Sequence, residues 1–205
     1  MLSFPLSAKC FSIESQLNTL SFHSESSQTG VIKQFKTGIS HYSFKLTFTH
    51  APTITEISAL EGFFLKVKSN TYNNTCLLPL PSQFDTKTTT TQAIPVRFNT
   101  NANTAQVQIK NLPVSTNNVL LAGDKIQFTN HHKLYVLLDN VNSDSNGYAT
   151  INIEPPLVYN VALDEQMKYK NLTPKVRIIN KTLDINYSPK LQKLPDLTFK
   201  EDLLF

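Results

Sequence analysis

The sequence HYSFKLTFT at residues 41–49 decides the class of fold. Its large apolar side chains are Tyr42, Phe44, Leu46 and Phe48, each followed by a small or polar residue. Successive side chains of a β-strand point to opposite faces, so this period of two predicts a strand with one aromatic face turned toward a core. The segment before it, residues 30–38, is bounded by glycines and predicts a second strand.

A helix is expected directly after this strand. Thr53 precedes it as the N-cap, and Glu56 follows three positions later, which is the spacing of a capping box. The apolar residues that recur every three or four positions are Ile54, Ile57, Leu60 and Phe64. We therefore predict a helix over residues 54–66 that buries this stripe. It is the only helix that the sequence predicts.

Short alternating segments dominate the chain from Ile94 onward. They cover the alternation of Ile94, Val96 and Phe98, then residues 106–110, 119–128, 134–138 and 148–153. Asn146-Gly147 is a strong hairpin signal and is expected to join the last two. Several short strands at this spacing predict a small antiparallel barrel or meander.

Strands are also expected near the C-terminal end, at residues 176–179, at the alternating Leu183, Ile185 and Tyr187, and at residues 197–200. With one helix among many strands, we expect an all-β protein that has a helix packed on a sheet.

Composition excludes several classes of protein. Of the 205 residues, 40% are hydrophobic and 17% are charged, and the 13 Phe and 7 Tyr are enough for a core, so we expect neither disorder nor a coiled coil. The net charge of +4 is spread over the chain without a basic stripe, which disfavours a dedicated nucleic-acid reader. We expect no signal peptide, no membrane span and folding in a cytosol.

The cysteines and histidines are not arranged for catalysis or metal binding. Cys10 and Cys76 allow at most one disulfide, and two partly buried free thiols are expected. Neighbours on a strand face opposite ways, so His131 and His132 cannot share one metal if a strand runs through them, and they could instead cap a hairpin. The remaining histidines, His23, His41 and His50, show no metal-ligand spacing.

Other catalytic signatures are missing as well. The five glycines build no phosphate-binding loop and no nucleophile elbow. The carboxylates of the barrel-like segment stand beside turns or strand ends, where solvated acids are ordinary, and they are Asp124, Asp139, Asp144 and Glu154. We therefore expect no enzyme, no cofactor, no metal and no catalytic residues.

Residues 119–157 resemble a stretch found in distal tail proteins of tailed bacteriophages. The shared pattern is VLLAGDKIQF at 119–128, HKLYVL at 132–137 and NSDSNGYATINIEPPL at 142–157, which in that family form a Gly-Asp turn, a strand, a Gly-centred turn and a strand leading to Pro-Pro-Leu. The order outside this stretch also resembles the family: SSQTG at 26–30, the aromatic strand, a helix and a closing strand.

This resemblance implies a ring-forming β-sandwich domain of tail-tube-like type with one flanking helix, built from residues 1–95 and 160–205. Residues 96–159 would then form an inserted small antiparallel β-barrel, OB-like in type. The resemblance further implies a virion protein assembled in the host cytoplasm into a homohexameric ring. The ring would join the tail tube protein to the tail hub or tail fibre proteins, and viral DNA would pass through its lumen without specific binding.

Two other functions remain open. The 96–159 segment could be a carbohydrate- or nucleic-acid-binding barrel, for which Tyr135 and Tyr148 are the candidate stacking residues. The chain could also be another virion part, such as a tail tube or head–tail joining protein.

Overall fold

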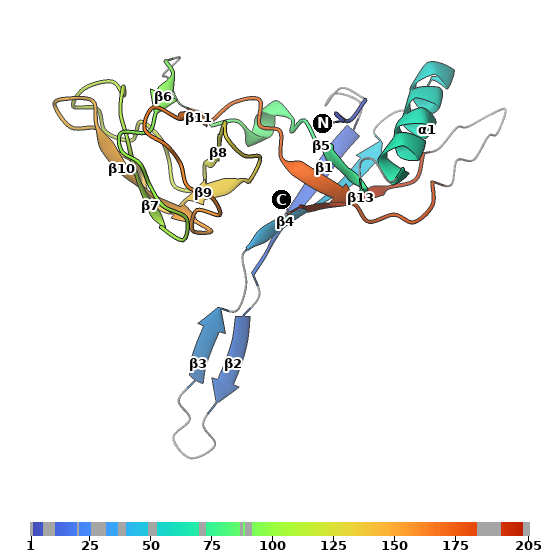
Figure 1. Ribbon diagram of the computed structural model, residues 1–205, viewed down its shortest axis with the longest axis horizontal. Coiled ribbons are helices and arrows are strands. Elements are labelled where there is room, and N and C mark those ends of the chain that lie inside the picture. Colours follow the sequence, from blue (N-terminus) through green and yellow to red (C-terminus); the bar gives the residue numbers. More distant parts are fainter. Residues whose placement is uncertain are drawn as a thin grey trace.

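The computed structural model describes residues 2–5, 11–19, 21–25, 32–36, 40–48, 53–69, 73–86, 88, 92–183 and 194–202. These residues form two larger sheets and one projecting hairpin, with a single α-helix among them (Figure 1). The described chain is therefore mostly β, as the sequence predicted. The predictions for Cys10, His50, Ile185 and Tyr187 concern residues outside the described ranges.

The five-stranded sheet brings together segments from both ends of the chain. In spatial order it contains β1 (Phe11–Asn18), β4 (His41–Phe48), β13 (Leu197–Glu201), β12 (Lys175–Ile178) and β5 (Thr75–Leu77). Every neighbouring pair is antiparallel. The predicted strands at 41–49, 176–179 and 197–200 are confirmed as β4, β12 and β13.

Helix α1 (Ile54–Lys68) begins with the predicted capping box. Thr53 Oγ1 accepts from the backbone N–H of Glu56 at 3.3 Å, and the Glu56 carboxylate accepts from the backbone N–H of Thr53 at 2.8 Å. The prediction that Ile54 is buried is wrong, because its side chain is 73% exposed. Each step of three residues turns a helix by only about 300°, so two such steps carry Ile54 off the stripe. The buried face is Ile57, Leu60, Phe63, Phe64 and Val67.

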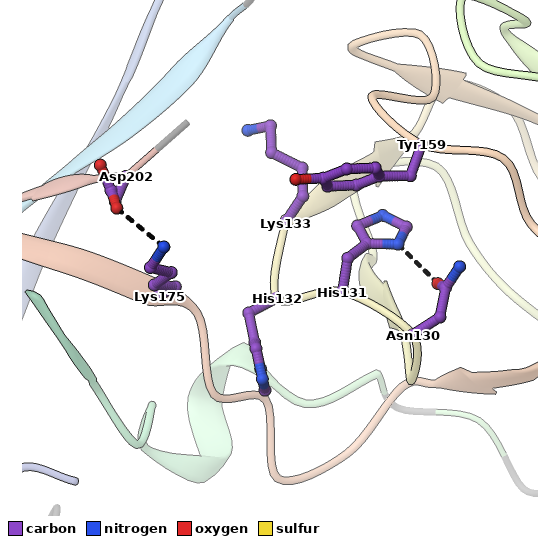
Figure 2. A pocket seen from close by; sticks show the side chains of 7 residues that line it. All are labelled: Asn130, His131, His132, Lys133, Tyr159, Lys175 and Asp202. Atoms are coloured by element: carbon purple, nitrogen blue, oxygen red, sulfur yellow. Dashed lines mark hydrogen bonds and ion pairs between the residues drawn. The ribbon is translucent and has the colours of Figure 1, made fainter. Parts of the chain in front are cut away.

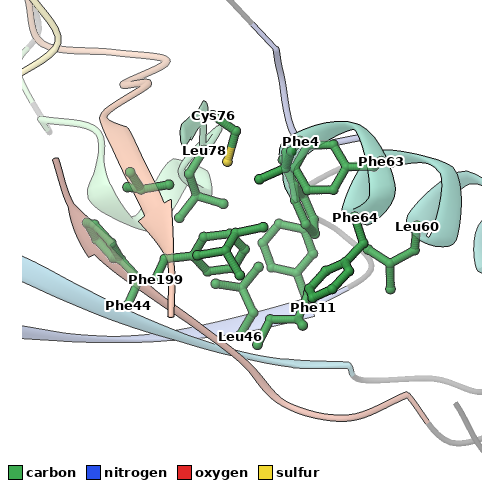
Figure 3. Packing of buried hydrophobic residues seen from close by; sticks show 14 of the residues in the cluster. Phe4, Phe11, Phe44, Leu46, Leu60, Phe63, Phe64, Cys76, Leu78 and Phe199 are labelled. Atoms are coloured by element: carbon green, nitrogen blue, oxygen red, sulfur yellow. The ribbon is translucent and has the colours of Figure 1, made fainter. Parts of the chain in front are cut away.

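The core between α1 and the sheet is built from aromatic rings. Phe4 meets Phe11, Phe63 and Phe199 edge-on, with ring centroids 5.3–5.8 Å apart. Figure 3 shows these rings gathered with Leu46 and Leu60 between the helix and the strands. Among the described residues the layer packed on this sheet is the helix, so the expected β-sandwich stays a prediction.

The second sheet, here called the curled sheet, has six antiparallel strands. In spatial order they are β6 (Ile94–Pro95), β11 (Gln166–Lys168), β8 (Lys125–Phe128), β9 (Tyr135–Leu137), β10 (Ala149–Glu154) and β7 (Gln106–Ile109). Its two edges meet at a bridge between Val96 and Ile109, beside a hydrogen bond of 2.8 Å from Arg97 N–H to Gln108 O. The sheet therefore curls on itself. This agrees with the prediction of short antiparallel strands in this part of the chain.

The core of the curled sheet runs from Ile94 to Tyr169 and is separate from the aromatic core. Strands β6 and β11 lie outside residues 96–159, so the segment that builds this sheet is longer than the insert implied by the resemblance. Within that segment the alternation of Ile94 and Val96 is confirmed, but Phe98 is 52% exposed because the strand ends at Pro95 and the chain bends at residues 97–98.

The prediction of a hairpin at Asn146-Gly147 is confirmed for the strand pairing but is wrong for the turn. Strands β9 and β10 do pair, through Leu137 with Ile153, but that pairing lies far from Gly147, so no tight two-residue turn joins them. Gly147 has φ +72° and its carbonyl accepts from Leu112 N–H at 3.0 Å. The turn is held instead by Asp144, whose carboxylate accepts from the backbone N–H groups of residues 146 and 148.

A two-stranded hairpin projects from the five-stranded sheet (Figure 1). It consists of β2 (Ser21–Glu25) and β3 (Ile32–Lys36), paired from Ser21 with Lys36 to Glu25 with Ile32. The strand expected within residues 30–38 is confirmed for Ile32–Lys36. No helix in the described part of the chain is long and apolar enough to cross a membrane.

Candidate functional site: a cleft where the two sheets meet

A cleft of about 360 Å³ lies at the junction of the curled sheet and the five-stranded sheet (Figure 2). It is lined by Asn130, His131, His132, Lys133, Tyr159, Lys175 and Asp202. The first four belong to the loop between β8 and β9, whereas Lys175 begins β12 and Asp202 directly follows β13. The cleft therefore joins residues that are far apart in the sequence.

His131 is fixed by hydrogen bonds on both ring nitrogens. Nε2 lies 2.7 Å from the hydroxyl of Tyr135, and Nδ1 lies 2.6 Å from Oδ1 of Asn130. Since an amide oxygen only accepts, Nδ1 carries the proton, and Nε2 accepts from the Tyr135 hydroxyl. That hydroxyl accepts in turn from Val158 N–H at 3.1 Å. One tautomer of the neutral imidazole therefore satisfies every hydrogen bond in this series.

The pKa of His131 is lowered to about 4, first by burial and then by repulsion from the nearby His132 and Lys133. The ring is therefore neutral at neutral pH. Burial also raises the pKa of the Tyr135 hydroxyl. Both groups hold their protons where the hydrogen bonds need them, so this part of the cleft is a fixed network rather than a proton-transfer site.

A buried ion pair lies behind the cleft. The Lys133 ammonium binds the carboxylate of Glu201, with both side chains almost fully removed from solvent. The same carboxylate accepts from Leu134 N–H at 2.7 Å and from Tyr42 N–H at 3.1 Å. Burial raises the pKa of Glu201 and lowers that of Lys133, and each partner opposes the shift of the other. Glu201 therefore joins the β8–β9 loop to two strands of the five-stranded sheet.

A second group of charges lies at the rim. Asp202 accepts from Lys175 at 3.1 Å and from Arg177 at 3.2 Å, and its side chain is only 4% exposed. Each lysine of the cleft thus has a carboxylate of its own. Such a balanced arrangement leaves little net field to attract a charged ligand.

Hydrogen bonds to backbone carbonyls also hold the β8–β9 loop in place. The carbonyl of His132 accepts from the side-chain amide of Gln127 at 3.0 Å and from Lys175 N–H at 3.3 Å. The His132 ring donates from Nδ1 to the carbonyl of Thr173 at 3.2 Å. Leu134 belongs to the aromatic core on the other side of the junction. The cleft therefore lies at the edge of a well-bonded contact between the two sheets, which we call the joint.

Of the residues singled out from the sequence, His131 and His132 line the cleft and Tyr135 contacts His131, whereas the four carboxylates lie elsewhere. Asp124, Asp139, Asp144 and Glu154 each bond locally or to one nearby side chain: Asp124 accepts from Leu121 N–H, Asp139 from Asn152 and Glu154 from Ser40. His131 and His132 lie in a loop between strands rather than on a strand. Within the described residues no three His, Cys, Asp or Glu side chains form a cluster that could hold a metal ion.

Tyr135 and Tyr148 differ in their surroundings. Tyr135 is fully buried, so it is a core residue and not a stacking platform. Tyr148 is half-buried and lies against the guanidinium of Arg97, whose Cζ is 4.0 Å from the ring centroid. Cys76 is buried in the aromatic core as a free thiol, and burial raises its pKa to about 12, which leaves it protonated and unreactive at neutral pH.

Sequence reasoning missed Lys133 and Glu201. One local signal existed: Leu197, Phe199 and Glu201 follow a period of two, so the alternation itself places a carboxylate on the buried face of β13. Neither the protein-family models nor the curated proteins compared with this chain gave a match.

Proposed function

We propose that the protein is a structural subunit of a bacteriophage tail, a ring protein of the distal tail type. The ring joins the tail tube protein on one side to hub or fibre proteins on the other, and viral DNA passes through it. The observation that carries the proposal is the hairpin β2–β3, which extends away from both sheets (Figure 1).

An isolated two-stranded hairpin is marginally stable in water. Among the described residues β2 and β3 pair only with each other, so each presents a second edge of backbone N–H and C=O groups. Such edges attract further strands. A neighbouring copy that covers this hairpin gives it the contacts that the described part of its own chain does not supply.

The edge strand β1 offers a second surface for assembly. It pairs only with β4 within the described part of the five-stranded sheet. A head-to-tail ring needs two different patches on each subunit, and the hairpin and the edge of β1 meet this requirement. A stable contact of this kind buries more than about 1,000 Å² in total.

The rigid joint at Glu201 also favours a structural role. A subunit that positions other proteins must hold its parts at a fixed angle, and the buried pair with its backbone hydrogen bonds does so. The same carboxylate would be poorly placed for catalysis, because it is buried and both of its oxygens already accept hydrogen bonds.

The test is the assembly state of a hairpin-deleted chain. Residues 20–39 are replaced by Asn-Gly, which joins Thr19 to Ser40 and keeps the pairing of Asn18 with His41. We expect the wild-type chain to form closed rings by light scattering and negative-stain microscopy, and the deleted chain to be a folded monomer.

A matched control changes the curled sheet instead. Thr150→Lys places a charge on an exposed position of β10, far from the hairpin, and rings should still form. A wild-type chain that remains monomeric at about 1 mM, a concentration at which even weak contacts are populated, contradicts the proposal. Rings formed equally well by the hairpin-deleted chain contradict the assigned interface.

A further inference from the structure

One cluster at the surface of the curled sheet places the guanidinium of Arg97 against two aromatic rings. The guanidinium carbon of Arg97 lies 4.0 Å from the ring centroid of Tyr148 and 4.8 Å from that of Phe98. Phe98 is 52% exposed, although it belongs to an otherwise apolar alternation. Two rings hold the planar group in place, so its N–H donors are oriented before any ligand arrives.

The cluster continues into a polar surface. Gln106 and Gln108 are the exposed residues of β7, and Gln108 pairs with the exposed Thr150 of β10. Tyr148 precedes Thr150 by two residues and so shares its face. We call this surface the Arg97 face: Arg97, Phe98, Gln106, Gln108, Tyr148 and Thr150. It lies at the end of the molecule away from α1 (Figure 1).

Arg97 is the only charged residue among the six that define the Arg97 face. Lys110 nearby binds Asp164 at 2.6 Å, and Asp139 accepts from Asn152 at 2.7 Å. In the part of the chain that the structure describes, Arg97 forms no ion pair with a carboxylate. A pre-oriented guanidinium of this kind matches a planar carboxylate, which it can bind through two parallel hydrogen bonds.

We propose that the Arg97 face binds an acidic oligosaccharide, with a sugar carboxylate on Arg97. The exposed ring of Phe98 offers a surface for the C–H face of a pyranose. The side-chain amides of Gln106 and Gln108 both donate and accept, as sugar hydroxyls require. A nucleic acid would call for several free cations along its backbone, whereas this face carries one.

The proposal does not depend on the ring. The Arg97 face lies on the curled sheet, and the hairpin projects from the other sheet, so the monomeric hairpin-deleted chain should bind the same sugars. Failure of glycan binding and failure of ring assembly are thus separate results.

The experiment titrates the full chain with three acidic probes: oligogalacturonate, a hyaluronan oligosaccharide and sialyllactose. Neutral lactose and a single-stranded oligothymidylate of matched length are the comparison ligands. Binding is followed by chemical shifts in ¹H–¹⁵N spectra. The variants are Arg97→Gln, Arg97→Lys and, as a control for net charge, Lys170→Gln, which removes an exposed cation beside Tyr169.

We expect at least one acidic sugar to bind with Kd of about 1 mM or tighter and to shift the amides of residues 97, 98, 108 and 148. Arg97→Gln should weaken it at least about tenfold, Arg97→Lys should weaken it less because the charge stays but the paired donors are lost, and Lys170→Gln should leave it unchanged. The proposal is overturned if no acidic sugar binds at about 10 mM, if Arg97→Gln binds equally well, or if the oligothymidylate binds more tightly than every sugar.

Discussion

The two sheets of this protein are stabilised in different ways. The five-stranded sheet relies on large rings from distant parts of the chain, with Phe4, Phe63 and Phe199 meeting in one core. The curled sheet has strands of only two to six residues. Its chain is turned by residues with positive φ, which include Asn103, Asn111, Ser115, Asn118, Asp164 and Asn171. Both regions have a buried core, but the second depends on local turn chemistry as well.

The joint between the regions follows neither pattern. The buried carboxylate of Glu201 in the five-stranded sheet pairs with Lys133 beside the curled sheet. Removal of one partner of a buried ion pair strongly destabilises the fold, because the other charge is left buried and unpaired. The comparison therefore predicts the largest mutational effect at the joint, smaller ones in the aromatic core, and the smallest at the turns.

Glu201→Ala should cost about 4 kcal/mol, because it leaves the Lys133 ammonium and the N–H groups of Tyr42 and Leu134 buried without their acceptor. The chain has no Trp, so far-UV circular dichroism in urea is the readout. We also expect the single unfolding transition to split, since the two regions lose their link.

A double variant distinguishes lost charge from lost shape. Lys133→Met with Glu201→Leu removes both charges together and should be more stable than Glu201→Ala alone. If Glu201→Ala does not fold, Glu201→Gln serves in its place. A loss below about 1 kcal/mol in either single variant would show that the pair is not what joins the sheets.

Phe64→Ala should cost about 3 kcal/mol, the lower end of the range for a large core ring, because Phe64 is 8% exposed at the margin of the core. Ile54→Ala is the matched control on the same helix and should change stability by less than about 0.5 kcal/mol, since its side chain is 73% exposed. Equal effects of the two variants would contradict the assignment of the buried face.

The dependence of stability on pH tests the hydrogen bonds of His131 in the cleft. The folded pKa of His131, about 4, lies below the ordinary value of 6.5, so the unfolded chain takes up the proton first. The neutral ring makes its full contribution to the free energy of unfolding above pH 6.5. As the pH falls toward 4, about 2–3 kcal/mol of this contribution is lost.

Glu201 acts with the opposite sign, because burial raises the pKa of its carboxyl group. The comparison of wild type with His131→Gln between pH 7 and pH 4.5 isolates the histidine. The variant should lose less stability over this range than the wild type. A parallel loss in both proteins would assign the acid sensitivity to other groups.

Local features of the fold were predictable from the sequence, and long-range ones were not. The capping box at Thr53 and the alternation at residues 41–49 are specified by neighbouring residues, and both were confirmed. The insertion of β13 between β4 and β12 joins segments more than 150 residues apart, and no periodicity encodes which strands become neighbours.

The cleft illustrates the same limit. Lys133 and Glu201 are 68 residues apart, so their contact could not be read from spacing, although the inward position of Glu201 on its strand was visible. The error at Ile54 came from treating a step of three residues as a full helical turn. The error at Gly147 came from reading a common dipeptide as a tight turn, where Asp144 directs the chain differently.

The two positive-φ glycines of the curled sheet give the smallest and most controlled test. Gly147 has φ +72° and Gly123 has φ +90°, so alanine is strained at both, by about 1 kcal/mol. They differ in space: a Cβ at Gly147 would lie 2.4 Å from the carbonyl oxygen of Leu112, while none of the described atoms lies within 4 Å of one at Gly123. The Leu112 oxygen belongs to the backbone, so the clash at Gly147 cannot be relieved by a change of rotamer.

Gly147→Ala should therefore cost about 2 kcal/mol and Gly123→Ala about 1 kcal/mol, measured as the difference in urea midpoints at equal m-value. Hydrogen exchange should place the extra loss of protection at Leu112 N–H, which donates to the Gly147 carbonyl. Equal costs at the two glycines would mean that backbone strain alone accounts for the loss at Gly147. The close approach to Leu112 would then contribute nothing to the stability of the curled sheet.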